Sequence, residues 1–201
     1  MDSDETHGAR QRPLPFAIHP IFQGESAQYI YGSKAESFVP SRFRVCLGIY
    51  FAGHNPLSQA DDPRVGPEGL LPDVELLTFM SKFLRACLRF GSSSSKDELV
   101  AVGSTDYRYD LRFTRQRNSV LIRLLRTSSV FRRAKVLAEV SESLQSLLVL
   151  CIAHAGLLRY GVEFVNSGIL KDRSFQSIEH DADALKKIFE DLWPTTPWWE
   201  I

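Results

Sequence analysis

Apolar and polar or small side chains alternate over residues 43–51 of the chain. The apolar positions are odd-numbered from Phe43 to Phe51, and they are separated by Arg44, Cys46 and two further residues of different character. A period of two places every second side chain on the same face of an extended segment. The pattern therefore predicts a strand over 43–51.

A second alternation predicts a β-hairpin. Tyr107, Tyr109 and Phe113 share one parity with an intervening leucine, and charged residues fill the positions between them. A β-like run at 120–125 follows across the polar turn 115–118, which is the spacing of two antiparallel strands joined by a short connection. Further strands are predicted at 99–102 and, extending the meander, at 131–140.

Three segments have helical periodicity. The first follows Asp73, a plausible N-cap, and runs to Gly91. The second covers 144–158 with Ser141 as its cap, and because it is apolar nearly all round, we expect it at the centre of the fold. The third is an amphipathic helix over about 177–193 that ends before Pro194.

This order of elements favours an α+β fold, with an antiparallel sheet of about four to five strands and helices packed mainly on one face. The chain has 201 residues, of which 44% are hydrophobic and 24% charged, a composition sufficient for one well-formed core. Prolines, glycines and isolated apolar residues dominate the start of the chain. We therefore expect an extended or loosely packed arm over 1–41 and a single domain over 42–201.

The three cysteines favour a reducing compartment. Cys46, Cys87 and Cys151 are widely spaced in apolar stretches, which predicts buried, reduced thiols rather than a disulfide framework or a zinc site.

The acidic N-terminus lacks the features of a secretion signal, and the apolar run 144–158 is shorter than the roughly 20 residues that span a bilayer. We expect a cytoplasmic protein.

Catalytic and cofactor motifs are weak, so no catalytic residue, metal site or cofactor is predicted. His54, beside the long loop 53–72, is the better candidate for an enzyme site, whereas His154 is interpreted as a satisfied core histidine. His180, Asp181 and Asp183, with Glu179 beside them, form an acidic cluster that could bind a divalent ion, but the dipole of a helix N-terminus explains these carboxylates without a metal.

Charge is distributed unevenly although the 24 basic and 24 acidic residues balance. Nine of the ten charged residues in the hairpin region 107–135 are basic, and acidic residues outnumber basic ones over 172–201. One interpretation is that the acidic C-terminal helix folds against the basic sheet. Another is that exposed arginines recognise an acidic protein surface, and a third is nucleic-acid binding.

The residues predicted to bind a partner come from the basic hairpin and from the tryptophan-rich C-terminus. They are Arg108, Arg112, Arg115, Arg117, Arg123, Trp198 and Trp199. The tryptophans either staple the tail to the core or anchor an interface.

The leading functional hypothesis is a non-catalytic binding protein that inhibits or neutralises a macromolecular partner, in the manner of an immunity protein. An acidic protein surface is the expected partner, and no membrane partner is expected. The alternatives are a nucleic-acid-binding protein that uses the hairpin 107–135 and an enzyme with a site near the loop 53–72.

Overall fold

The helices and strands are defined by a computed structural model, which describes residues 15–22, 24–60, 62–102, 108–117, 119–127 and 134–200. The strands are β1 Phe16–Ile21, β2 Arg44–Phe51, β3 Leu71–Glu75, β4 Asp97–Val102, β5 Arg108–Gln116, β6 Ser119–Thr127 and β7 Ala134–Ser143. The α-helices are α1 Gly24–Gly32, α2 Leu76–Gly91, α3 Leu144–Asn166 and α4 Arg173–Leu192. Short 3₁₀-helices occupy Ala35–Ser37, Pro40–Arg42, Pro67–Gly69, Ser167–Lys171 and Trp198–Glu200.

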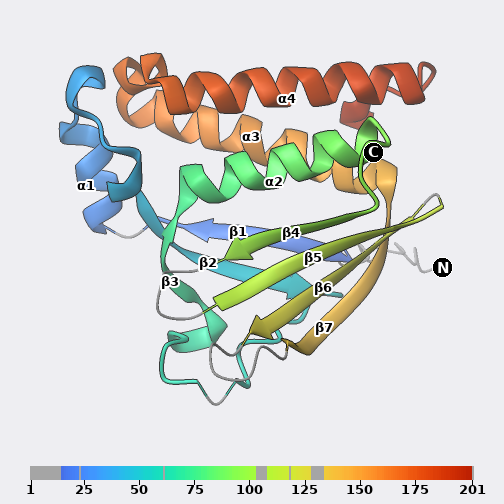
Figure 1. Cartoon of the computed structure of the whole chain (residues 1–201). Coiled ribbons are helices and arrows are strands. Elements are labelled where there is room, and N and C mark those ends of the chain that lie inside the picture. The colour runs from blue at the N-terminus through green and yellow to red at the C-terminus, as the bar shows by residue number, and fades with distance from the viewer. Residues whose placement is uncertain are drawn as a thin grey trace, which may run out of the picture.

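The predicted α+β class is confirmed, with α2, α3 and α4 gathered on one side of the strands (Figure 1). The strands form two antiparallel sheets rather than one, in the orders β1-β2-β3 and β4-β5-β6-β7. Both sheets contribute to one continuous apolar core. Phe16 of β1 and Phe113 of β5 meet edge to face there, with ring centroids 6.4 Å apart.

The predicted hairpin is present as β5 and β6. Their register pairs Gln116 with Ser119 next to the turn, and Arg117 in the turn has a left-handed φ of 53°. Tyr109 and Phe113 are fully buried, so the apolar parity of β5 faces the core. Tyr107 and the start of the strand predicted at 131–140 lie outside the described residues, and the described strand β7 runs from Ala134 to Ser143.

The N-terminal segment is packed more closely than a loose arm would be. Strand β1 pairs with β2 from Phe16 opposite Phe51 to Ile21 opposite Cys46. Phe16 and Ile18 are buried because this pairing turns them into the core. The apolar residues of this segment are isolated among prolines and show no regular spacing, so the sequence did not predict β1. The proposed division at residue 41 stays a prediction.

Three helix starts differ from the predicted ones, and for the first two the reason is that the preceding strand continues past the predicted cap. Asp73 lies within β3 and has a φ of 55°, so α2 begins only after Glu75. Strand β7 continues beyond the predicted cap Ser141 to Ser143, which caps α3 by accepting a hydrogen bond from the Ser146 amide at 2.9 Å. Helix α4 begins earlier than predicted, with Asp172 as its cap.

Helix α3 occupies the predicted place in the core but is buried on one side only. Leu147, Leu148 and Cys151 are completely buried. Leu157 and Phe164 farther along the helix are 68% and 84% exposed. The predicted core position therefore holds for one face of 144–158, whereas Leu157 within that range is exposed.

We predict that Leu148→Ala lowers the free energy of unfolding by about 2–5 kcal/mol, because the surrounding packed side chains cannot refill the cavity. Leu157→Ala on the same helix is the control and should change it by less than about 1 kcal/mol, because Leu157 is 68% exposed. Urea denaturation of both variants measures the difference. Equal midpoints for the two variants would contradict the assignment of the core face.

Candidate functional site

Two of the predicted partner-binding arginines belong to a row of paired charges on the outer face of the four-stranded sheet. Arg112 and Arg123 are opposite one another in the register of β5 and β6. Arg112 forms an ion pair with Asp97 of β4 at 2.6 Å, and Arg123 forms one with Glu139 of β7 at 2.9 Å. The Arg112 guanidinium lowers the pKa of Asp97 from its ordinary value. The charges of Arg112 and Arg123 are therefore neutralised by carboxylates of the same sheet.

Of the other predicted arginines, Arg115 and Arg117 lie apart from this row at the hairpin end of β5. Arg115 donates hydrogen bonds to the Phe90 carbonyl at 2.6 Å and to the Ser93 hydroxyl at 2.9 Å, so it joins β5 to the end of α2. Arg117 is exposed at the hairpin turn. Arg108 begins β5, and its side chain lies outside the described part of the structure.

The acidic C-terminal helix pairs with other helices instead of the basic sheet in the described ion pairs. Asp181 of α4 lies 3.3 Å from Arg85 of α2, and Glu179 lies 3.1 Å from Arg159 of α3. These contacts do not support the interpretation that α4 folds against the basic sheet. The helices α2, α3 and α4 lie on one side of the strands, and the outer face of the four-stranded sheet points away from them (Figure 1).

The tryptophans divide between the core and the surface. Trp193 packs on Phe189 with ring centroids 5.0 Å apart, and Trp198 is half-buried against the core. Lys186 places its ammonium 5.9 Å from the Trp198 ring centroid. Trp199 is 68% exposed, so it is the member of the cluster that solvent reaches most freely.

A buried carboxylate fastens the long loop to the four-stranded sheet. The Asp62 side chain is completely buried and lies 2.8 Å from Arg64 and 3.1 Å from Arg126 of β6. The Tyr109 hydroxyl donates a hydrogen bond to Asp62 at 2.8 Å. Hydrogen bonds from Arg64 and Tyr109, with the charge of Arg126, hold the pKa of Asp62 well below its ordinary value although burial raises it.

This cluster is suited to anchoring rather than to proton transfer near neutral pH. Burial and the hydrogen bond to Asp62 raise the pKa of Tyr109 to about 12, so the phenol stays protonated while the carboxylate stays ionised. General acid–base catalysis works best when the pKa lies near the operating pH.

The predicted enzyme candidate His54 is exposed on the tight turn after β2. Over the described residues, no group of three or more metal-ligating side chains is assembled.

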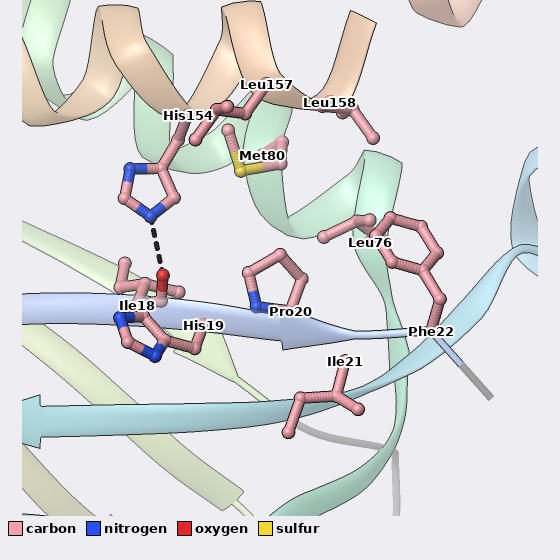
Figure 2. Close-up of a pocket in the computed structure, with 10 residues that line it drawn as sticks. All are labelled: Ile18, His19, Pro20, Ile21, Phe22, Leu76, Met80, His154, Leu157 and Leu158. Atoms are coloured by element: carbon pink, nitrogen blue, oxygen red, sulfur yellow. Dashed lines mark hydrogen bonds between the residues drawn. The ribbon is translucent and has the colours of Figure 1, made fainter. Parts of the chain in front are cut away.

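An apolar groove lies where β1, α2 and α3 meet (Figure 2). Its volume is about 500 Å³. The lining residues are Ile18, His19, Pro20, Ile21, Phe22, Leu76, Met80, His154, Leu157 and Leu158. A concave, largely apolar site with a few polar groups is typical of ligand and peptide binding.

His154 holds β1 beside α3 at the wall of this groove (Figure 2). Its Nε2 lies 2.5 Å from the Ile18 carbonyl oxygen of β1, and its Nδ1 lies 2.8 Å from the Leu150 carbonyl oxygen. Carbonyl oxygens only accept, so a neutral ring donates to one of them and an imidazolium donates to both. Both ring nitrogens thus have a carbonyl oxygen within hydrogen-bond distance, but His154 is half-buried at the groove wall and does not lie in the core as predicted.

The groove continues into an exposed apolar surface along α3. We define the apolar face as Ile21, Phe22, Leu157, Tyr160 and Phe164, which are 41%, 44%, 68%, 71% and 84% exposed. Ile21, Phe22 and Leu157 also line the groove, and the other two follow Leu157 on successive turns of α3. Isolated exposed apolar residues are common on proteins, but a contiguous series beside a groove indicates an interaction site.

Sequence reasoning missed this face because it ended the apolar run at residue 158. The apolar character continues beyond Arg159, and Leu144–Lys171 is long and apolar enough to cross a membrane by length and composition alone. Only 33% of its most apolar window is buried in the fold. A helical projection extended to residue 165 would have grouped Leu157, Tyr160 and Phe164 on one side.

No protein-family model, curated protein or solved structure matches this chain.

We predict that Asp62→Asn lowers the free energy of unfolding at pH 7 by about 3 kcal/mol, because two arginines lose their shared buried carboxylate. The folded-state pKa of Asp62 is depressed, so its stabilisation is present above the unfolded pKa of about 4 and is lost as the pH falls below that value. The difference between wild type and variant should therefore shrink on acidification.

Urea denaturation between pH 7 and pH 2 measures this dependence. Asp183→Asn is the control, because Asp183 is 71% exposed in its pair with Lys186 and should contribute little at any pH. A constant difference between wild type and Asp62→Asn across the range would show that charge is not the cause.

Proposed function

We propose that this protein is a non-catalytic binding protein that docks another protein through the apolar face and thereby inhibits or neutralises it. The observation that carries the proposal is the series Leu157, Tyr160 and Phe164, which stands exposed on α3 beside the groove. We also propose that this docking inhibits the partner, which is the role expected of a small binding protein with such a surface.

The energetics favour a protein partner at this face. Removing a large apolar side chain from water contributes roughly 1.5–3 kcal/mol when it becomes fully buried. Aromatic side chains at the centre of an interface are frequent hot spots, and Tyr160 and Phe164 supply two of them on one rigid helix. A partner with a short apolar segment would fit both the groove and the adjoining helix surface.

A predominantly acidic partner surface has less support than the sequence suggested. Arg112 and Arg123 already have carboxylate partners on neighbouring strands, and a competing acidic surface must displace Asp97 and Glu139. Exposed ion pairs exchange with small net gains. The arginines therefore contribute to the specificity or rate of association more than to affinity.

Among the residues that the structure describes, the predicted places show no arrangement suited to either alternative function. Sequence-specific or single-strand nucleic-acid binding uses aromatic side chains that stack on bases, and Tyr109 and Phe113 of the hairpin are buried in the core. The loop beside His54 contains the Asp62 anchor, whose groups titrate far from neutral pH. A membrane surface is less favoured than a protein because helices that lie on membranes are typically rich in Lys and Arg, whereas α3 has one basic residue, Arg159, and it is paired with Glu179 of α4.

We predict that Phe164→Asp abolishes binding of the protein partner while the fold remains intact, because a charge then stands at the most exposed position of the apolar face. Leu99→Asp is the matched control, since Leu99 is an apolar side chain on the outer sheet face with 55% exposure. Proteins captured by wild type, Phe164→Asp and Leu99→Asp are compared by quantitative mass spectrometry, and circular dichroism checks the fold.

Loss of a specific protein with Phe164→Asp alone supports the proposal. Equal capture by Phe164→Asp and wild type would sink it. Two further measurements separate other occupants: light scattering detects a dimer of this chain that the substitution disrupts, and sedimentation with anionic phosphatidylserine vesicles detects membrane binding. Either result in place of protein capture would replace the proposed partner class.

We predict that reversing both Arg112 and Arg123 to Glu lowers the free energy of unfolding by about 1–2 kcal/mol, because the new carboxylates stand beside Asp97 and Glu139. Capture of a partner through the apolar face should persist. Loss of capture by this folded double variant would instead assign the interface to the four-stranded sheet. A compensating variant that also changes Asp97 and Glu139 to Lys should recover the stability.

A further inference from the structure

Helices α2 and α3 bring two buried thiols into contact. The Sγ atoms of Cys87 on α2 and Cys151 on α3 are 3.1 Å apart, and both residues are fully buried. The two positions are 64 residues apart in sequence, so the contact is produced by the packing of the helices. Cys46 lies elsewhere, on β2, and all three cysteines are buried as the sequence predicted.

The packing around this pair keeps the two helices close. Gly91 lies one turn after Cys87, and a Cβ atom added to it would meet Ile188 of α4 at 2.7 Å and Leu148 of α3 at 3.7 Å. Leu148 lies one turn before Cys151 and is completely buried. The glycine at this point therefore permits the close approach of α2 to α4, and Leu148 of α3 packs beside it at ordinary van der Waals distance.

We propose that Cys87 and Cys151 form an oxidation site at which hydrogen peroxide converts the two thiols into a disulfide. A disulfide requires the sulfur atoms to approach to about 2.05 Å, so the pair must close by roughly 1 Å. Helix packing has already brought the two residues together, which removes most of the conformational search.

The reaction balances with peroxide as the oxidant. One thiol sulfur attacks a peroxide oxygen, the O–O bond breaks, and a sulfenic acid and one water molecule form. The second thiol then attacks the sulfenic sulfur, the S–O bond breaks, and the disulfide and a second water molecule form. Two electrons pass from the sulfur atoms to the peroxide oxygens, and the two thiol protons end in water.

Burial makes this site slow to react rather than a rapid sensor. Burial and the neighbouring Cys87 raise the pKa of the Cys151 thiol, which reduces the fraction of the nucleophilic thiolate at neutral pH. The oxidation rate should therefore increase with pH. Once formed, the bond closes a long loop between α2 and α3 and restricts the unfolded chain, so the oxidised protein should unfold at a temperature several degrees higher.

The test is to incubate the purified full chain with hydrogen peroxide, unfold it, alkylate the remaining thiols and measure the intact mass. The expected product has lost the mass of two hydrogen atoms and carries one alkyl group, on Cys46. Proteolysis should give a disulfide-linked pair of peptides containing Cys87 and Cys151. Cys87→Ser and Cys151→Ser should each lack this product, and Cys46→Ser should retain it.

Three other results overturn the proposal. The first is alkylation of all three cysteines in peroxide-treated wild type. The second is a gain of oxygen on Cys87 or Cys151 without a linked peptide. The third is a link that involves Cys46 or a second molecule. Because the experiment uses no binding partner, its outcome is independent of the proposed function.

Discussion

Helix α3 is the constraint on which the rest of the structure depends, since it contacts elements from both ends of the chain. It packs against α1, α2 and α4 and against the strands β6 and β7. At its middle, His154 bonds to the Ile18 carbonyl of β1. At its end, the Asn166 side chain donates to the Ile30 and Ser33 carbonyls at 2.9 and 2.8 Å, which satisfies oxygens at the end of α1. The N-terminal segment is thus held in place by a helix more than 100 residues away.

The same arrangement produces the apolar face. Helix α3 buries one face against α2, α4 and the sheet. Apolar residues that lie on its other faces remain exposed. Leu157, Tyr160 and Phe164 are those side chains. They stand on a helix fixed by the core, so a partner that covers them does not have to order a flexible segment first, which reduces the entropy lost on binding.

The local patterns predicted more of the fold than of the surface. Strand parity in β2 and β5 is a property of neighbouring residues, and it correctly indicated which side chains face the core. The division into two sheets, the start of α2 after Glu75 and the pairing of Arg112 with Asp97 all depend on contacts between distant segments. No periodicity in a single segment contains that information. The contact of Cys87 with Cys151 is hidden for the same reason, because each cysteine by itself resembles an ordinary core thiol.

The basic hairpin illustrates how far charge counting can mislead. Nine of ten charges over 107–135 are basic, yet Arg112 and Arg123 find carboxylates on β4 and β7, and Arg126 finds the buried Asp62. The row of paired charges and the apolar face consequently differ in what a partner must displace. Contact with the charged row requires the removal of water from paired ions, and the Coulomb energy gained is small when partners merely exchange. Contact with the apolar face removes water from side chains that, apart from the Tyr160 hydroxyl, have no hydrogen bonds to lose, and desolvation therefore favours association there. For the protein partner that we propose, the orientation is accordingly set by which face is easier to desolvate, and the charges of the four-stranded sheet disfavour the alternative orientation.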